Sequence, residues 1–253
     1  MSSPPPLLAS PPPLDVEHHA LFLDLDGTLI EIEEHPQAAL ADEALIESLR
    51  RLAQATNGAV AIVSGRTIDD IERITQGAIA NMAGLHGLDL RIGKAAFLNA
   101  GFTGADISSA TGELGAMIEQ GTLGVLLEDK GKSIALHYRN APHQAARVCK
   151  IATQIARKYG LRVLHGKMVV ELLPSQRTKG DALIDLMGQR PFAGRVPIAI
   201  GDDVTDEDAF AAANRLGGCS ILVGPARATA ARYRLSSTAA LRGWLAVPTP
   251  GSH

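Results

Sequence analysis

The sequence predicts an α/β protein whose core is a parallel β-sheet, with a smaller α+β domain inserted into that core. Short, continuous apolar runs such as "ALFL" at residues 20–23 are typical of strands that are buried on both faces. Helical patterns alternate with these runs in the β-α-β-α order of a parallel sheet. Between residues 92 and 174 the pattern changes to strands separated by short turns, which favours an antiparallel insert.

The first part of the core begins with the strand at residues 20–23. The stretch "DEALIESLRRLAQATNG" then places Leu45, Leu49 and Leu52 on one helical face, and its Asn-Gly pair is a good C-terminal stop. Residues 59–63 predict a second buried strand. The helix after it has Thr67 as its expected N-cap and two aspartates in its first turn.

The insert and the rest of the core follow the same rules. Strands are predicted in "TLGVLLED", "KSIALHYR", "LRVLHG" and "MVVELL", with helices near residues 105–120 and 142–159. A helix in "TKGDALIDLMG", strands in "VPIAIGDD" and "CSILVG", and helices in "TDEDAFAAAN" and "STAALRGWLA" then resume the parallel pattern. We therefore expect a disordered proline-rich tail at residues 1–15, a core at 16–91 and 175–247, and an insert at 92–174.

Composition excludes several classes of partner. The 24 basic and 27 acidic residues give a net charge of −3 without a run of like charge, so neither a nucleic-acid footprint nor a membrane-binding patch is visible. No apolar stretch reaches the roughly 18 residues needed to span a bilayer. Cys149 and Cys219 lack the spacing of a disulfide framework or a zinc site. We expect a cytoplasmic monomer that acts on a small molecule.

Acidic residues follow two of the predicted strands directly. Asp24 and Asp26 come after the strand at residues 20–23, and Asp202 and Asp203 come after "VPIAI". The carboxyl ends of parallel strands meet at one edge of a sheet, where α/β proteins bind ligands. Like charges gathered at that edge cost stability unless a cation compensates them. The sequence therefore predicts a metal site.

Two further motifs indicate an anion site at the same edge. Ser64-Gly65-Arg66 follows the strand at residues 59–63, and a hydroxyl beside a helix N-terminus is a natural phosphate contact. Lys179 opens a later helix, where its ammonium would lie beside an anion. In "VTDED", Thr205 and Asp208 have the spacing of a capping box, so Glu207 and Asp208 are assigned to capping the helix.

In this order, "DLDGT", "SGR", the helix-opening lysine and "GDDVTD" resemble the four motifs of the haloacid dehalogenase (HAD) superfamily of phosphohydrolases. The resemblance implies a Rossmann-like core, and the insert between the second and third motifs resembles the larger cap domains of that superfamily. The segments "AGLHG", "EDKGKSIALHYRNAP" and "GKMVVELLP" are similar to trehalose-6-phosphate phosphatases. The similarity extends over residues 16–244.

The resemblance implies a role for each motif residue. Asp24 would be the nucleophile that forms an aspartyl-phosphate, and Asp26 the general acid and base. Mg²⁺ would bind Asp24, the backbone carbonyl of Asp26 and Asp202, with Asp203 and Asp206 as supporting or additional ligands. Residues Ser64 and Lys179 would hold the phosphoryl group. Arg66 either joins them or is a surface arginine at a helix start.

Sugar recognition is assigned to polar side chains of the cap, because a disaccharide offers hydroxyl groups rather than charge. His137 has an equal alternative as a satisfied strand histidine, and Arg139 as an ion-pair partner. Leu173 departs from the family, which commonly has a basic residue there. The expected substrate-binding residues are Asp24, Leu25, Asp26, Arg66, Glu128, Lys130, His137, Arg139, Lys167 and Glu171.

The function that the resemblance implies is Mg²⁺-dependent hydrolysis of trehalose 6-phosphate to trehalose and phosphate. Two alternatives within the enzyme class are a phosphatase acting on sucrose, glucosylglycerol or mannosylglycerate phosphate, and a phosphomutase that returns the phosphoryl group to sugar. From a different class, the chain could be a non-catalytic sugar-phosphate sensor. Such degenerate members usually lose an aspartate, whereas Asp24, Asp26 and Asp202 are all present.

Overall fold

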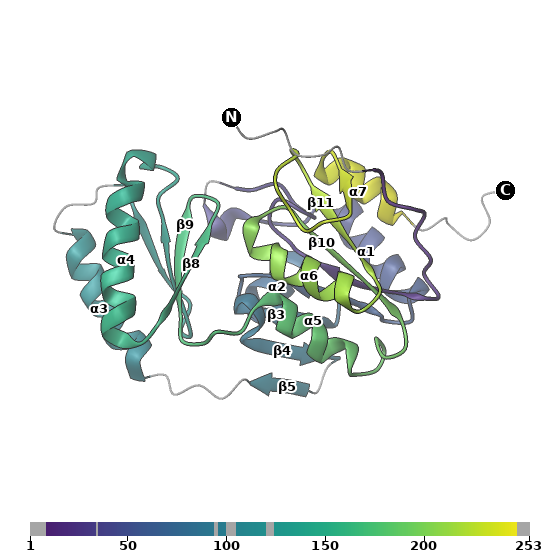
Figure 1. Cartoon of the computed structure of the whole chain (residues 1–253), viewed down its shortest axis with the longest axis horizontal. Helices are drawn as coiled ribbons and strands as arrows, with labels where there is room; N and C mark the ends of the chain where they lie inside the picture. Colours follow the sequence, from purple (N-terminus) through teal and green to yellow (C-terminus); the bar gives the residue numbers. More distant parts are fainter. Residues whose placement is uncertain (1–8, 34, 94–95, 100–104, 120–123, 247–253) are drawn as a thin grey trace. The chain divides into compact units, whose positions relative to one another are not determined.

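The computed structural model describes residues 9–33, 35–93, 96–99, 105–119 and 124–246. The described residues divide into two compact units, one within Met1–Leu98 and Arg177–His253 and the other within Asn99–Gln176 (Figure 1). The first unit is called the core and the second the insert.

The core is built on an eight-stranded sheet in the order β12-β11-β10-β1-β2-β3-β4-β5. The pairs from β12 to β3 are all parallel, and β4 joins β3 in the antiparallel direction. The parallel sheet of the predicted α/β class is therefore confirmed. Its strands are β1 (His19–Leu23), β2 (Val60–Val63), β3 (Asn81–Gly84), β4 (Asp89–Ile92), β5 (Ala96–Asn99), β10 (Val196–Gly201), β11 (Cys219–Val223) and β12 (Tyr233–Leu235).

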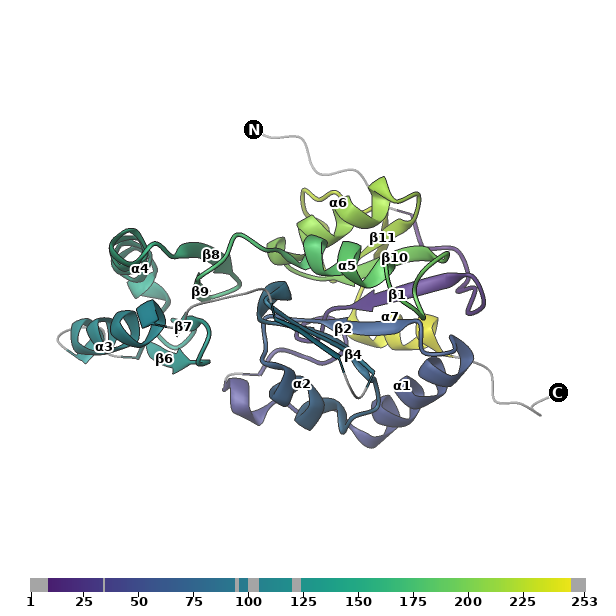
Figure 2. The ribbon, with the colours of Figure 1, turned by 90° about the horizontal axis from the view of Figure 1, so that it is seen from below.

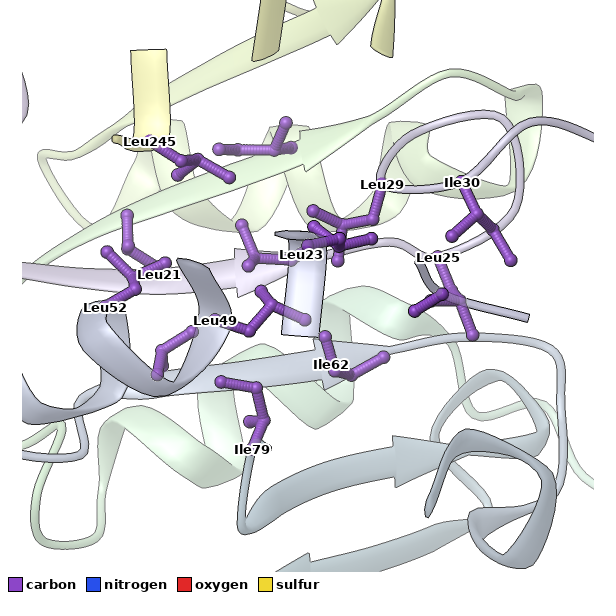
Figure 3. Packing of buried hydrophobic residues seen from close by; sticks show 14 of the residues in the cluster. Leu21, Leu23, Leu25, Leu29, Ile30, Leu49, Leu52, Ile62, Ile79 and Leu245 are labelled. Carbon is purple, nitrogen blue, oxygen red and sulfur yellow. The ribbon is translucent and has the colours of Figure 1, made fainter. Parts of the chain in front are cut away.

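Helices cover both faces of this sheet, as Figure 2 shows. Successive side chains of a strand point to opposite faces, so Leu21 and Leu23 pack toward one set of helices and Ala20 and Phe22 toward the other. Figure 3 shows the first of these two layers, in which leucines of β1 meet those of α1. The first layer contains α1 (Glu43–Ala55), α2 (Ile68–Thr75) and α7 (Thr238–Leu245), and the second α5 (Lys179–Met187) and α6 (Glu207–Arg215).

Side-chain caps fix where several of these helices begin. Thr67 accepts a hydrogen bond from the Asp70 amide, so its predicted N-cap role is confirmed. A reciprocal capping box opens α5, with Thr178 as the N-cap. The predicted capping box of Thr205 with Asp208 is wrong, because α6 begins at Glu207 directly after a short 3-10 helix. The short 3-10 helices of the described residues are η1 (Pro36–Ala38), η2 (Leu85–Gly87), η3 (Pro142–Gln144) and η4 (Val204–Asp206).

The insert is an antiparallel sheet with two helices packed on one face (Figure 1). Its strand order is β6-β7-β9-β8, and every pair is antiparallel, as the sequence predicts. Apolar residues that alternate along β7 and β9 form the insert's own hydrophobic core with the helices. The elements are α3 (Ala105–Glu119), β6 (Leu126–Asp129), β7 (Ile134–His137), α4 (Ala145–Tyr159), β8 (Arg162–Gly166) and β9 (Val169–Leu173).

Two parts of the chain differ from the expected domain limits. Strands β4 and β5 extend the core sheet, so the insert begins at Asn99 rather than at residue 92. Residues 1–8 of the expected disordered tail lie outside the described residues. The rest of that tail contacts the core: the Pro12 carbonyl accepts a 2.8 Å hydrogen bond from the Trp244 indole, and Leu14 packs against the core cluster. Within the described ranges, no helix is both long and apolar enough to cross a bilayer.

Candidate active site

The carboxyl ends of three neighbouring strands bring the predicted acidic residues together. Asp24 follows β1 directly, Ser64 follows β2, and Asp202 follows β10. The parallel register pairs Leu23 with Ile200 and with Ile62, so these strands end at the same level. From β1 the chain continues to β2 and β3 on one side, and from β10 it continues to β11 and β12 on the other. The strand order therefore reverses between β1 and β10, which is the position where open α/β sheets bind ligands.

A buried lysine joins two of the carboxylates. The Lys179 Nζ lies 2.6 Å from Asp24 Oδ1 and 2.7 Å from Asp206 Oδ1, and its side chain is only 3% exposed. Burial by itself would lower the pKa of Lys179, but the charges of Asp206 and Asp24 outweigh that effect and raise the pKa above its usual value. The lysine therefore stays protonated and supplies a fixed positive charge beside Asp24.

The surroundings of Asp24 disfavour its ionised form. Its side chain is buried and accepts a 3.0 Å hydrogen bond from the Thr28 hydroxyl. Burial raises the pKa of the Asp24 carboxyl well above its usual value, the Lys179 charge opposes the rise, and the charges of Asp206 and Asp202 add to it. A second cation at this point would favour the ionised carboxylate.

The structure brings three carboxylates into position for such a cation. Asp24, Asp202 and Asp206 each offer one oxygen, and these oxygens lie within 4.8 Å of one another. Carboxylate oxygens are the hard ligands that Mg²⁺ and Ca²⁺ prefer. The donor set therefore fits a hard divalent cation. Asp203, which the sequence prediction placed among the metal ligands, is not a member of this group.

A glycine lets one of these carboxylates approach the turn after β1. Gly27 has a φ of +82°, and a Cβ built on it would lie 2.3 Å from Asp202 Oδ2. A side chain at this position would occupy the space that the Asp202 carboxylate fills. The close approach explains why "DLDG" carries glycine at its fourth position.

The loop after β10 orients its acids through its own backbone. Asp206 Oδ2 accepts hydrogen bonds of 3.0 Å from the amides of both Asp202 and Asp203. Asp203 instead caps η4, where its carboxylate accepts a 2.7 Å hydrogen bond from the Val204 amide. The turn therefore directs Asp206 into the acidic group and engages Asp203 in capping.

Asp26 is held by Arg66 rather than by the acidic group. Two hydrogen bonds, of 2.6 and 2.7 Å, join the guanidinium to the two carboxylate oxygens, and a third of 2.7 Å reaches the Pro36 carbonyl. Such a bidentate pair fixes the carboxylate plane. The Arg66 amide donates in turn to the Ser64 hydroxyl oxygen at 3.2 Å. The "SGR" motif therefore positions Asp26, a role that the sequence analysis did not assign to it.

The predicted polar residues of the insert form two clusters on its sheet. Lys130 Nζ lies 2.9 Å from Glu171 Oε1, and the buried Ser133 hydroxyl donates to the same oxygen at 2.8 Å. Glu128 and His137 are 2.7 Å apart on neighbouring strands. Burial alone would raise the pKa of Glu128, but the hydrogen bond from His137 and the Lys130 charge hold it below its usual value.

The remaining predicted residues lie in loops of the insert and in the hydrophobic core. Arg139 and Lys167 lie in the loops after β7 and β8, and a 3.0 Å backbone hydrogen bond from Tyr138 to Met168 joins these two loops. Leu25 is fully buried in the hydrophobic core, so a ligand contact there would use its backbone (Figure 3). Leu173 is also fully buried, at the end of β9.

Comparisons with known proteins agree with this geometry. The sequence model described as trehalose-phosphatase matches residues 22–239. The chain belongs to the trehalose-phosphatase family. A probable trehalose-phosphate phosphatase of Sinorhizobium fredii is 42% identical over 235 residues, covering 92% of this chain and 88% of that protein. The trehalose-6-phosphate phosphatase of Escherichia coli is 37% identical over 234 residues, covering 91% and 86%.

Solved structures support the assignment of the fold. The crystal structure of a trehalose-6-phosphate phosphatase related protein aligns with a TM-score of 0.75 at 27% identity, covering 89% of this chain and 94% of that one. The C-terminal domain of Candida albicans trehalose-6-phosphate phosphatase aligns with a TM-score of 0.79 at 24% identity, covering 90% and 91%. The trehalose-phosphatase family fits the HAD superfamily, and that membership implies a divalent metal at the acidic group.

Proposed function

We propose that the protein hydrolyses trehalose 6-phosphate to trehalose and inorganic phosphate. The observation that carries this proposal is the buried Asp24 carboxylate, which contacts Lys179 and shares the acidic group with Asp202 and Asp206. A nucleophile, a fixed positive charge and a set of cation ligands then lie at one sheet edge. The substrate is that of the Sinorhizobium fredii and Escherichia coli relatives, which are named as trehalose-phosphate phosphatases.

The reaction would run in two steps through Asp24. A carboxylate oxygen of Asp24 attacks phosphorus, the bond from phosphorus to the sugar oxygen breaks, and Asp26 gives its proton to the departing sugar. Asp26 then takes a proton from water, which attacks the aspartyl-phosphate, releases phosphate and restores Asp24. Arg66 donates to both Asp26 oxygens, so one of these hydrogen bonds has to open before Asp26 can carry the proton that it gives to the sugar. The pair holds the ionised carboxylate in the orientation in which it takes a proton from water.

Electrostatic complementarity to the phosphoryl group is assigned to three sources. Lys179 supplies a permanent charge, and Ser64 supplies a hydroxyl at the end of β2. We propose that Mg²⁺ would be held by Asp24, Asp202 and Asp206, together with the Asp26 carbonyl that the resemblance implies. When bound, it would neutralise the carboxylates and the charge that develops on the phosphoryl oxygens.

Sugar recognition is proposed for the polar clusters of the insert. The Glu171 carboxylate is buried and already oriented by Lys130 and Ser133, so its position is fixed before a ligand arrives. Fixed polar groups of this kind distinguish sugars by their hydroxyl pattern. The cytoplasmic location and the monomeric state remain predictions from the sequence.

The test is phosphate release from trehalose 6-phosphate, sucrose 6-phosphate and glucose 6-phosphate, with and without Mg²⁺. We expect trehalose 6-phosphate to be preferred and Mg²⁺ to be required. Asp24→Asn should abolish release, whereas Asp69→Asn, a change on the exposed first turn of α2, should leave it intact. Preference for sucrose phosphate would refute the substrate, and no release from any of the three would favour the sensor.

A further inference from the structure

One arginine outside the four motifs contacts the backbone of the loop after β10, which carries Asp202 and Asp203. Arg227 lies in the segment between β11 and β12, and its guanidinium donates a 2.7 Å hydrogen bond to the Asp203 carbonyl. A longer contact of 3.4 Å reaches the Asp202 carbonyl. Three quarters of the Arg227 side chain is covered, so these contacts are partly shielded from water. No step of the proposed reaction uses this residue.

The start of α6 fixes the position of this arginine. Glu207, the first residue of α6, forms an ion pair with the Arg227 guanidinium. The same carboxylate accepts hydrogen bonds from the Thr229 hydroxyl at 2.8 Å and from the Ala230 amide at 2.7 Å. Glu207 therefore anchors the segment that carries Arg227. It also occupies the first turn of α6, as its place in the sequence indicates.

The peptide unit that joins Asp202 to Asp203 is held at both of its polar groups. Its N–H donates to Asp206 Oδ2, and its C=O faces the Arg227 guanidinium. A peptide unit fixed at both groups resists rotation, and rotation here would swing the Asp202 side chain away from Asp24. The rigid carboxylate geometry that Mg²⁺ requires thus depends on contacts outside the acidic group.

We propose that Arg227 is a positioning residue that holds Asp202 in the geometry needed to bind the divalent cation. The inference rests on the proposed function, because it requires a cation at the acidic group. Charge alone would give the opposite effect: a nearby guanidinium repels a cation, so removing it would tighten metal binding. The direction of the change in affinity therefore separates positioning from simple electrostatics.

The experiment measures the Kd of Mn²⁺, used as a spectroscopic substitute for Mg²⁺, by electron paramagnetic resonance of the free ion. Arg227→Met removes the charge and the hydrogen bonds, and Arg227→Lys keeps the charge but loses the branched donor geometry. Arg234→Met is the matched control, because Arg234 also bonds a backbone carbonyl, that of Gly224 at 2.7 Å, and carries the same charge. Thermal unfolding of each metal-free variant reports its stability separately.

We expect both Arg227 variants to raise the Kd about 10- to 100-fold, as the loss of supporting partners does at other metal sites, and Arg234→Met to leave it unchanged. An unchanged or lower Kd in the Arg227 variants would overturn the inference. If Arg227→Met fails to fold, Arg227→Lys decides by the same criterion. Absence of Mn²⁺ binding to the wild type would overturn the proposed metal site together with the role of Arg227. Normal binding to the wild type with an unchanged Kd in the Arg227 variants would overturn the role of Arg227 alone.

Discussion

Replacing Gly27 by alanine perturbs the turn after β1 by a single methyl group. The new Cβ would lie 2.3 Å from Asp202 Oδ2, and contacts shorter than 3.0 Å are essentially absent from real structures. The turn and the carboxylate must therefore separate by about 0.7 Å, a displacement that the near-ideal octahedral geometry required by the proposed Mg²⁺ would not tolerate. Misplacement on this scale costs about 100-fold in rate.

Backbone strain has to be separated from this displacement. Alanine at a positive φ costs about 1–2 kcal/mol of stability wherever it occurs. Gly77 provides the control, because its φ is +65° and a Cβ there would meet nothing within 4 Å. We expect Gly77→Ala to show that loss in urea unfolding while keeping its activity.

The assay is phosphate release from trehalose 6-phosphate at several Mg²⁺ concentrations. Gly27→Ala should lose activity about 100-fold and require more Mg²⁺. Wild-type activity and metal dependence in Gly27→Ala would refute the reasoning. An equal loss of activity in Gly77→Ala would also refute it, because the effect would then come from strain alone.

Three further predictions concern the cap of α5, the buried lysine and the insert. Thr178→Ala and Ser237→Ala each remove a helix N-cap, and each should lower the free energy of unfolding in urea by about 1 kcal/mol. Only Thr178→Ala should also lower activity, because Thr178 positions the lysine that follows it. Equal activity in both variants would contradict this. Lys179→Met leaves two buried carboxylates without a counter-charge and should lose about 3–5 kcal/mol at neutral pH in the absence of divalent cations. Burial raises the pKa of the Asp24 carboxyl, so an unpaired carboxylate there destabilises the fold as the pH rises through that raised pKa, and does not when it is protonated. The deficit should therefore shrink on acidification toward the ordinary aspartate pKa of about 4, and a constant deficit would argue against the unpaired charges. The pKa of Glu128 is lowered, so its contribution is present above the usual glutamate range and is lost on acidification. Glu128→Gln should destabilise the insert at neutral pH, and its difference from the wild type in urea titrations should shrink as the pH falls below the ordinary glutamate pKa of about 4.3. A difference that stays constant in acid would exclude the proposed cause.

The sequence predicted which edge of the sheet carries the site, because the ends of buried strands can be recognised from short apolar runs in the sequence. Asp24 and Asp202 each follow a continuous apolar run, and parallel pairing brings such ends together without further information. The sequence did not indicate whether Asp203 or Asp206 would lie beside Asp24 and Asp202. It depends on a single turn of 3-10 helix, in which one carboxylate caps the backbone and the other points to Lys179.

Other features were missed because they have weak local signals. Strand β12 is short and only partly buried at the sheet edge, so it lacks an apolar run. Arg227 lies in a segment without a helical or strand pattern, and the Asp203 carbonyl that it contacts is 24 positions away in the sequence. Pro12 lies in a segment whose composition is typical of disorder, although its carbonyl accepts a hydrogen bond from the Trp244 indole in the folded chain.

The most direct test of the proposed reaction is a rapid acid quench with trehalose 6-phosphate labelled in its phosphoryl group. The proposed mechanism predicts transient label on the wild-type protein, in the peptide that contains Asp24, and none on Asp24→Asn. The label should be lost on mild alkaline treatment, as an acyl phosphate is. Phosphate release without protein-bound label, or release from Asp24→Asn at the wild-type rate, would contradict the assignment of Asp24 as the nucleophile.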